Sequence, residues 1–272
     1  MIAFPIAKIN IGLRVTGKRN DGFHDIETIF YPVGLCDALE FVVPSGQVTA
    51  DELTVTGINI GSRPDKNLVM RCVRKMRENY PVPNLKIHLH KAIPPAAGLG
   101  GGSSDAACMI KAINKCFSLS LNETTLKSIA LDLGSDCPFF IDPVPSRATG
   151  RGEILKPVSN ILDGYNIVLI NPRIRISTRD AYNNCVPSKP KKSLEQLVTL
   201  HPSGWKKLIA NDFEDYAFKL YPEIREIKRS LYGAGAVYSS MSGSGSTVYG
   251  IFDKKPEIPV NLKEFMLFEG RL

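Results

Sequence analysis

The sequence is poor in the patterns that mark several common classes of protein. Its 272 residues contain no long uncharged apolar stretch, so no transmembrane helix is predicted. The first residues, Met1 to Lys8, have neither the basic start nor the apolar core of a secretory signal. We therefore expect a cytoplasmic protein with no membrane partner.

Cysteine and histidine are scarce and scattered. The six cysteines, at positions 36, 72, 108, 116, 137 and 185, include no Cys-x-x-Cys pair. That absence argues against a zinc site and against a disulfide framework, and it predicts buried, reduced thiols. The four histidines form no metal-ligand spacing. His88 and His90 alternate along an expected strand, so both side chains should lie on the same side.

Negative charge is in deficit: 34 Lys and Arg residues exceed 27 Asp and Glu residues, which gives a net charge of +7. A positive surplus favours an anionic partner, either a phosphorylated metabolite or a nucleic acid. The basic residues are spread along the chain, apart from a short run at 189–192. Since no basic stripe is concentrated in one segment, nucleic-acid binding is disfavoured.

The most informative segment that the chain does contain is a glycine-rich stretch at residues 94–107, Pro-Pro-Ala-Ala-Gly-Leu-Gly-Gly-Gly-Ser-Ser-Asp-Ala-Ala. Because side chains are nearly absent from Gly98 to Gly102, backbone N–H groups can approach a ligand closely. Helix formers follow at once, and Ser103 or Ser104 is predicted to cap that helix. Bare amides at the positive end of a helix are typical of a phosphate site.

This loop differs from the familiar phosphate-binding motifs. No Gly-Lys-Ser/Thr ends it, and Ser103 stands where a dinucleotide fingerprint needs its third glycine. The chain also has no His-Arg-Asp or Asp-Phe-Gly segment of the protein-kinase type. A flexible Gly/Ser linker is the alternative. It is disfavoured because the loop joins an apolar strand pattern to an apolar helix pattern.

Hydrophobic periodicity predicts both strands and helices along the chain. At residues 7–16, Ile9 and Ile11 alternate with Lys8 and Asn10, which indicates a strand with one apolar and one polar face. Proline and glycine crowd residues 143–157, and we expect a domain boundary near 145–160. The other expected strands are 23–35, 37–43, 53–55, 85–90, 165–171 and two within 237–252. The expected helices are 67–79, 104–117, 122–133, 177–183, 194–200, 212–220 and 222–232. The first of these helices has an apolar side that includes Cys72 and Met76, and Asn122 is expected to cap the third.

Three separated segments together resemble the three motifs of the galactose, homoserine, mevalonate and phosphomevalonate (GHMP) kinase superfamily. They are Ala7–Leu13, the glycine-rich loop, and Met241–Ser246. Two further segments, Gly17–His24 and Gly134–Phe139, strengthen the likeness, which runs in the same order over nearly the whole chain.

The resemblance implies an α+β fold in two domains. It implies an N-terminal domain at 1–155 similar to domain 2 of ribosomal protein S5, and a ferredoxin-like C-terminal domain at 156–272. The active site would lie in the cleft between them. It also implies transfer of the γ-phosphoryl group of ATP, with Mg²⁺, to a hydroxyl of a small alcohol. The segments fit best the members that phosphorylate a cytidylyl-bearing alcohol on the non-mevalonate route to isoprenoid precursors.

Two residues are the candidates for catalysis. Asp136 follows Gly134 in a tight turn, and a carboxylate there can accept the hydroxyl proton. Taken alone, Asp136 would instead be interpreted as a cap of the next turn. The Lys8 ammonium would keep that carboxylate ionised and stabilise a developing alkoxide. The alternative for Lys8 is a solvated strand residue, which the neighbouring Asn10 disfavours.

The binding residues follow from the same resemblance. His24 matches a cytosine-reading histidine, Phe23 stands where a tyrosine is often found, and Tyr182 matches an aromatic that stacks on cytosine. An ordinary core aromatic is the alternative for Tyr182. Lys91 is a weaker candidate for the nucleotide region, Asp105 is assigned a structural role, and the Mg²⁺ ligands are not identified. The predicted substrate residues are Asn10, Phe23, His24, Thr178 and Tyr182, and the predicted ATP residues are Asn67, Pro95, Ala96, Ala97, Gly98, Leu99, Gly100, Gly101, Gly102, Ser103 and Ser104.

Two alternatives stay open on the sequence. Another GHMP member acting on a different alcohol would leave His24 and Tyr182 as ordinary residues; a decarboxylating relative is disfavoured by the segment Asp21–His24. A nucleic-acid-binding module would show steeply salt-dependent RNA binding and no kinase activity. The sequence does not determine the oligomeric state.

Overall fold

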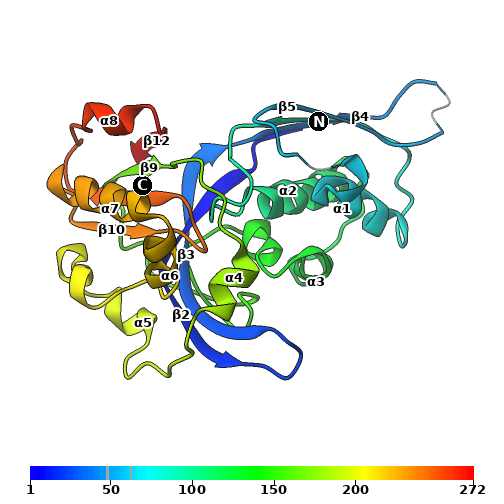
Figure 1. The fold of residues 1–272 in the computed structure, drawn as a ribbon. Helices are drawn as coiled ribbons and strands as arrows, with labels where there is room; N and C mark the ends of the chain where they lie inside the picture. The colour runs from blue at the N-terminus through cyan, green and yellow to red at the C-terminus, as the bar shows by residue number, and fades with distance from the viewer. Residues whose placement is uncertain (47–48, 62) are drawn as a thin grey trace. The chain divides into compact units, whose positions relative to one another are not determined.

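The computed structural model describes residues 1–46, 49–61 and 63–272, and it has the predicted α+β composition (Figure 1). Packing divides the chain into two compact units. Unit 1 consists of residues 1–7, 35–95 and 100–143, and unit 2 consists of residues 8–34, 96–99 and 144–272. The predicted domain boundary at 155/156 stays a prediction.

Unit 1 contains a four-stranded sheet in the order β1-β4-β6-β5. All neighbours pair antiparallel except β5 and β6, which are parallel. Residues alternate between exposed and buried along β6, so one face carries the core. The prediction that His88 and His90 lie on the same side is confirmed, and that side is the exposed one. The strands are β1 (Ile2–Ala3), β4 (Ala38–Val42), β5 (Glu52–Gly57) and β6 (Lys86–Lys91).

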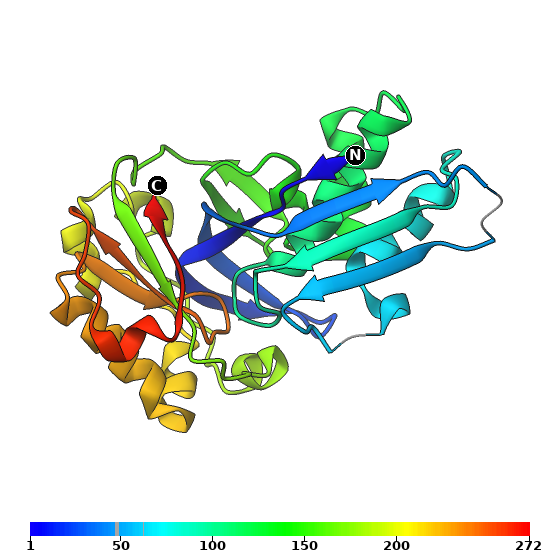
Figure 2. The ribbon, with the colours of Figure 1, turned by 90° about the horizontal axis from the view of Figure 1, so that it is seen from above.

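The helices of unit 1 lie on one side of this sheet, as Figures 1 and 2 both show. The predicted apolar face of the first helix is buried, including Cys72 and Met76. Asn122 caps the third helix by accepting from the amide of Thr125, as the sequence predicts. The elements are η1 (Pro64–Lys66), α1 (Leu68–Arg77), α2 (Gly101–Cys116), α3 (Glu123–Leu133) and η2 (Cys137–Ile141).

A sheet in the order β2-β3-β7-β8 contributes most of its residues to unit 2. The expected strand at 7–16 is observed as β2, but its polar face is as buried as its apolar face between Ala7 and Leu13. The short strands β7 and β8 were not predicted. The bounds are β2 (Ile6–Lys18), β3 (His24–Cys36), β7 (Ser146–Thr149) and β8 (Ile154–Pro157).

The second sheet of unit 2 is antiparallel, in the order β10-β11-β9-β12. Its core joins Val168 and Val248 of the sheet to Ile224 and Leu231 of α7. The strands are β9 (Asn166–Ile170), β10 (Tyr238–Met241), β11 (Val248–Phe252) and β12 (Met266–Arg271). The helices are α4 (Thr178–Asn183), α5 (Leu194–Leu197), η3 (Pro202–Lys207), α6 (Glu214–Leu220), α7 (Pro222–Gly233) and α8 (Val260–Lys263).

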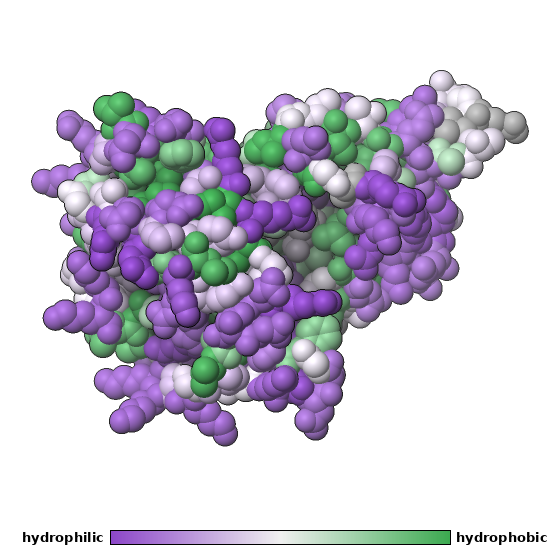
Figure 3. Space-filling model, in the orientation of Figure 1, coloured by the Kyte–Doolittle hydropathy of each residue, from purple (hydrophilic) through white to green (hydrophobic). Residues whose placement is uncertain are grey.

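The visible surface carries mostly hydrophilic residues with scattered apolar ones (Figure 3). Val186 and Val260 are among the apolar side chains that are exposed. Among the described residues, every helix is too short or too polar to pass through a bilayer.

Candidate active site

The middle of the glycine-rich loop packs tightly against the predicted third motif within unit 2. Gly98 has a φ of 77°, and a Cβ there would lie 1.8 Å from the carbonyl oxygen of Ser242. The Ser242 hydroxyl donates to the carbonyl oxygen of Gly98 over 2.8 Å. Only glycine permits this approach of one backbone to another. The third motif therefore supports the loop.

The end of the loop differs from the prediction. Helix α2 begins at Gly101, and its N-cap is Gly100 in the left-handed conformation with a φ of 70°. The prediction that Ser103 or Ser104 caps the helix is wrong, because both already lie in its first turn. The first amides of a helix have no partner within it. At α2 these amides include those of Gly101 and Gly102, so the positive end of the helix dipole lies at the triple glycine itself.

Lys8 is buried in unit 2, with 3% of its surface exposed, so the alternative of a solvated strand residue is wrong. Its ammonium donates to Oδ1 of Asn10 over 2.5 Å and to the carbonyl oxygen of Gly98 over 3.2 Å. It also lies 4.8 Å from the centre of the Phe30 ring. These contacts hold a positive charge directly against the glycine-rich loop.

The orientation of the Asn10 amide is fixed by a chain of hydrogen bonds. The Thr28 hydroxyl donates to the carbonyl oxygen of Gly12 over 2.5 Å, and it accepts from Nδ2 of Asn10 over 3.0 Å. Since the amide nitrogen faces Thr28, the amide oxygen faces Lys8. Sequence reasoning missed Thr28. The only feature of the sequence that could have indicated its role is a hydroxyl-bearing residue within an otherwise apolar strand.

Asp136 lies in the turn between α3 and η2 of unit 1, immediately before Cys137. It occupies the N-cap position of η2, but its side chain makes no capping bond to that helix, so the capping interpretation is wrong for the described η2. Burial raises the pKa of the Cys137 thiol to about 11, whereas a side-chain hydrogen bond with Ser103 acts to lower that pKa. η2 packs against α2 within unit 1, so the turn of Asp136 lies beside this helix.

Two candidates for the nucleotide region have other partners in unit 1. Asn67 is buried and caps α1, where its Oδ1 accepts from the amide of Val69 over 2.8 Å. Lys91 is buried between two carboxylates, those of Asp37 and Asp105. Any contact of Asn67 with ATP stays a prediction, and the ammonium of Lys91 is committed to its carboxylates.

The residues predicted to bind cytosine meet in unit 2. The rings of His24 and Tyr182 are stacked, with centroids 4.9 Å apart and planes 17° apart. An edge contact joins Tyr182 to Phe213, with centroids 4.8 Å apart, and Tyr182 also packs on the core of the unit. Tyr182 is therefore part of the core, as the alternative interpretation predicts, and its ring also stacks on His24. Its contact with cytosine stays a prediction.

The remaining substrate candidates lie at the surface of unit 2. Phe23 is 51% exposed, and the Arg151 guanidinium lies 4.9 Å from its ring centre. The Thr178 and Ser244 hydroxyls are 3.0 Å apart, which ties α4 to the third motif. Arg151 is a cation beside the predicted cytidylyl site that sequence reasoning missed. Lys8 and Asp136 belong to different units, and their pairing stays a prediction.

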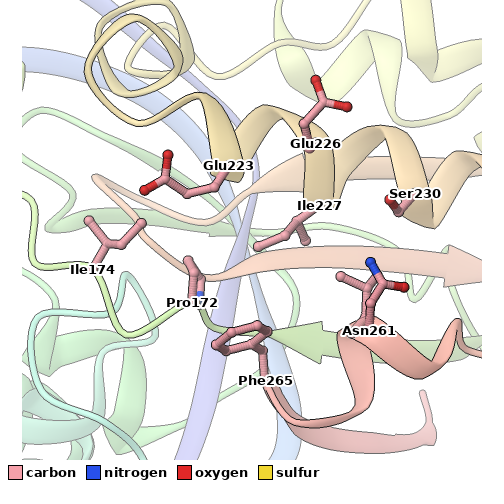
Figure 4. A pocket seen from close by; sticks show the side chains of 9 residues that line it. Pro172, Ile174, Glu223, Glu226, Ile227, Ser230, Asn261 and Phe265 are labelled. Atoms are coloured by element: carbon pink, nitrogen blue, oxygen red, sulfur yellow. The ribbon is translucent and has the colours of Figure 1, made fainter.

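A cavity of about 430 Å³ lies elsewhere in unit 2, beside α7 and α8 (Figure 4). Apolar side chains, including Ile227 and Phe265, form part of its wall, and Glu223 and Glu226 stand on α7 at its edge. It contains none of the predicted site residues. In the described parts of the chain, no group of three or more His, Cys, Asp or Glu side chains is placed to hold a metal ion.

Comparison with known proteins identifies relatives over the whole chain. The GHMP kinases N terminal domain matches residues 67–142, and the GHMP kinases C terminal model matches residues 193–266. The 4-diphosphocytidyl-2-C-methyl-D-erythritol kinase of Azobacteroides pseudotrichonymphae is 47% identical over 268 residues, 98% of each chain. The protein of the same name from Bacteroides thetaiotaomicron is 46% identical over 274 residues, covering both chains fully.

Solved structures agree with this relationship. A crystal structure of 4-(cytidine 5'-diphospho)-2C-methyl-D-erythritol kinase matches with a TM-score of 0.77 and 30% identity, over 94% of this chain and 91% of that one. The mevalonate kinase of Methanococcus jannaschii matches with a TM-score of 0.66 at 13% identity, over 97% of this chain and 92% of that one. The second likeness shows the fold alone.

Proposed function

The chain belongs to the 4-diphosphocytidyl-2-C-methyl-D-erythritol kinase family of the GHMP kinases, and from that premise we propose that it phosphorylates the 2-hydroxyl of 4-diphosphocytidyl-2-C-methyl-D-erythritol with ATP. The product is the 2-phosphate, an intermediate on the non-mevalonate route to isoprenoid precursors. The observation that carries the proposal is the buried ammonium of Lys8, held by Asn10 against the carbonyl oxygen of Gly98 in the glycine-rich loop.

Transfer breaks the bond between the γ-phosphorus of ATP and its bridging oxygen and forms a bond from that phosphorus to the substrate oxygen. ADP leaves with the bridging oxygen. The hydroxyl proton passes to the carboxylate of Asp136, the predicted base. Lys8 stabilises negative charge on the reacting oxygens as the proton leaves. The unpaired amides at the start of α2 bind the phosphates.

Mg²⁺ is the proposed second cofactor. It takes oxygen ligands and is usually held by substrate phosphates, one or two protein groups and waters, so it needs no cage of three protein side chains. The cation would arrive with ATP, beside the hydroxyl-bearing first turn of α2, and would neutralise phosphate charge. The residues described above contribute binding and proton transfer independently of it.

The stacked rings of His24 and Tyr182 support a cytosine site that opens on binding. Two stacked rings 4.9 Å apart leave no room for a base between them, since each contact needs about 3.5 Å. Phe213 already meets Tyr182 edge-on. We therefore propose that cytosine takes the face of Tyr182 that His24 covers, and that the imidazole turns aside to hydrogen-bond the base.

Replacing Tyr182 with alanine tests this assignment. We expect the KM for the cytidylyl substrate to rise roughly tenfold or more, because the stacking surface is lost, while the KM for ATP stays within about twofold. Steady-state kinetics with each substrate varied in turn gives both values. Tyr182→Phe is the matched control, since it keeps the ring. An equal rise in both constants would remove Tyr182 from the cytosine site.

The activity itself is tested by incubating the purified protein with Mg²⁺-ATP and the cytidylyl alcohol, with homoserine, mevalonate and galactose as parallel acceptors. Mass spectrometry of the products identifies the phosphorylated compound. The proposal predicts one added phosphoryl group on the cytidylyl alcohol alone. Phosphorylation of another acceptor instead would refute the proposed substrate and keep the GHMP kinase assignment.

A further inference from the structure

A buried cluster of three charged side chains lies beside the glycine-rich loop in unit 1, and the mechanism above does not use it. Lys91, Asp37 and Asp105 are each 4% exposed or less. The ammonium of Lys91 forms ion pairs with both carboxylates, and its contact with Oδ2 of Asp105 is 2.7 Å. Lys91 is the last residue of β6, Asp37 immediately precedes β4, and Asp105 lies in the second turn of α2.

The cluster holds the start of the loop through Asp37. Its Oδ1 accepts from the amide of Ala92 over 2.6 Å and from the amide of Ile93 over 2.8 Å. These two residues connect β6 to the prolines that open the loop. Charged acceptors make such hydrogen bonds roughly twice as strong as neutral ones. The path of the chain into the loop is therefore fixed by one carboxylate.

The cluster holds the end of the loop through α2. Asp105 stands four residues after Gly101 on this helix. A Cβ on Gly101 would lie 2.8 Å from Cγ2 of Ile93 and 3.3 Å from Nζ of Lys91. The start of α2 thus packs directly on the segment that Asp37 holds, and Lys91 joins the two.

We propose that Lys91, Asp37 and Asp105 act as a positioning cluster that sets the distance between the two ends of the glycine-rich loop, and thereby the affinity for the ATP phosphates. The inference rests on the proposed function of the loop as the ATP phosphate site. None of the three side chains need touch ATP. Their effect passes through the amides of Ala92 and Ile93 and through the first turn of α2.

One carboxyl oxygen of this cluster has no partner among the described residues, and this supports a role for the cluster other than stabilising the fold. Burying an ammonium and two carboxyl groups costs free energy that their mutual attraction offsets only with good geometry, and an apolar core is often as stable. Within the described residues, Oδ1 of Asp105 has no hydrogen-bond partner although it is buried. A buried polar atom left unsatisfied in a native fold calls for an explanation other than stability. Holding the loop supplies one.

The test is ATP binding by three variants of the cluster, with a non-hydrolysable ATP analogue titrated calorimetrically. Asp105→Ala removes an acceptor of Lys91, and we expect its Kd for the analogue to rise about tenfold or more. Asp105→Asn keeps an acceptor oxygen and should recover most of that loss. Where Asp105→Ala does not fold, Asp105→Ser replaces it, because its side chain is too short to reach Lys91 and should weaken binding similarly.

Asp51→Asn is the matched control. Asp51 is a half-buried carboxylate of unit 1 that pairs with Arg77 and accepts from the amide of Leu85, the residue immediately before β6 begins. Its substitution should lower the melting temperature and leave the Kd for the analogue within about twofold.

Two results would overturn the proposal. One is a folded Asp105→Ala or Asp105→Ser variant that binds the analogue as tightly as the wild type. The other is an equal loss of affinity in Asp51→Asn, which would mean that general destabilisation causes the effect. Failure of the proposed function is distinguishable from both, because the wild-type protein would then not bind the analogue.

Discussion

At the scale of single residues, the orientation of one amide group decides how Lys8 is held. Asn10 presents its oxygen to the ammonium because Thr28 occupies its nitrogen, and Thr28 is itself oriented by the carbonyl oxygen of Gly12. The hydroxyl of Thr28 therefore helps to position the ammonium of Lys8, and it does so through the amide of Asn10. A buried side-chain network of this kind is worth more than its separate bonds.

Replacing Thr28 with valine should lower kcat about tenfold and leave the KM for ATP within about twofold, because the side-chain volume is kept while the amide of Asn10 loses its acceptor. Steady-state kinetics on the folded variant measures both constants. Thr28→Ser retains the hydroxyl and should restore most of the lost turnover. A Thr28→Val enzyme with wild-type kcat would contradict the role given to this network.

Asp105 gives a second prediction at this scale, on the dependence of stability on pH. Burial raises its pKa from 3.8 to about 7, against the lowering effect of Lys91 and with a further increase from Asp37. The folded chain thus binds a proton more tightly than the unfolded chain. The stability that this proton contributes is complete below about pH 4 and is lost as pH rises through about 7.

The variant Asp105→Asn cannot titrate, so its unfolding free energy relative to the wild type should increase between about pH 4 and pH 8. Denaturant unfolding at several pH values in this range measures the difference. A difference that stays constant with pH would show that the carboxyl of Asp105 is ionised throughout.

At the scale of elements, alternation and capping in the sequence were good guides where the interactions are local. β6 shows the exposed and buried alternation expected from its residues, and Asn122 caps α3. The start of α2 was predicted wrongly, because the backbone conformation of Gly100 overrides the capping preference of the serines that follow. The polar side chain of Ser103 gives no indication of the left-handed backbone conformation of Gly100.

The features that sequence reasoning missed depend on partners far along the chain. The strands β7 and β8 have four residues each, too few for a clear period; β7 pairs with the longer β3, and β8 pairs with β7. Lys91 joins Asp37 and Asp105, which are 54 and 14 residues away. No local pattern indicates such a cluster, so the resemblance identified the loop and left the means of holding it undetermined.

Asn211 shows how one distant side chain supports a whole motif. Its buried Nδ2 donates to the carbonyl oxygens of Met241 and Gly243, each over 2.8 Å, and its Oδ1 accepts from the amide of Phe213. Asn211→Ala removes these three hydrogen bonds. We expect a loss of about 2 kcal/mol in the free energy of unfolding and a rise of severalfold in the KM for ATP.

The measurement combines denaturant unfolding with steady-state kinetics. Asn114→Ala is the matched control, since Asn114 bonds both backbone groups of Leu121 in unit 1 without reaching the loop. It should lower stability and leave the KM for ATP unchanged. If both variants changed the KM equally, Asn211 would have no special relation to the third motif.

At the scale of the whole molecule, charge and family membership point to one chemistry. The net charge of +7 suits two polyphosphorylated substrates, ATP and a cytidine diphosphate derivative. Each unit contributes a different part of the proposed reaction. Unit 2 holds Lys8 with Asn10 and the stacked His24 and Tyr182, whereas unit 1 carries Asp136 and the start of α2.

The most direct test of this account is the effect of Asp136→Asn on turnover and on ATP binding in one preparation. The substitution keeps the shape of the side chain and removes its basicity. We predict that phosphorylation of the cytidylyl alcohol falls by about a thousandfold while the Kd for an ATP analogue changes by less than about threefold. Wild-type turnover in this variant, or an equal loss of turnover and ATP binding, would contradict the assignment of Asp136 as the base.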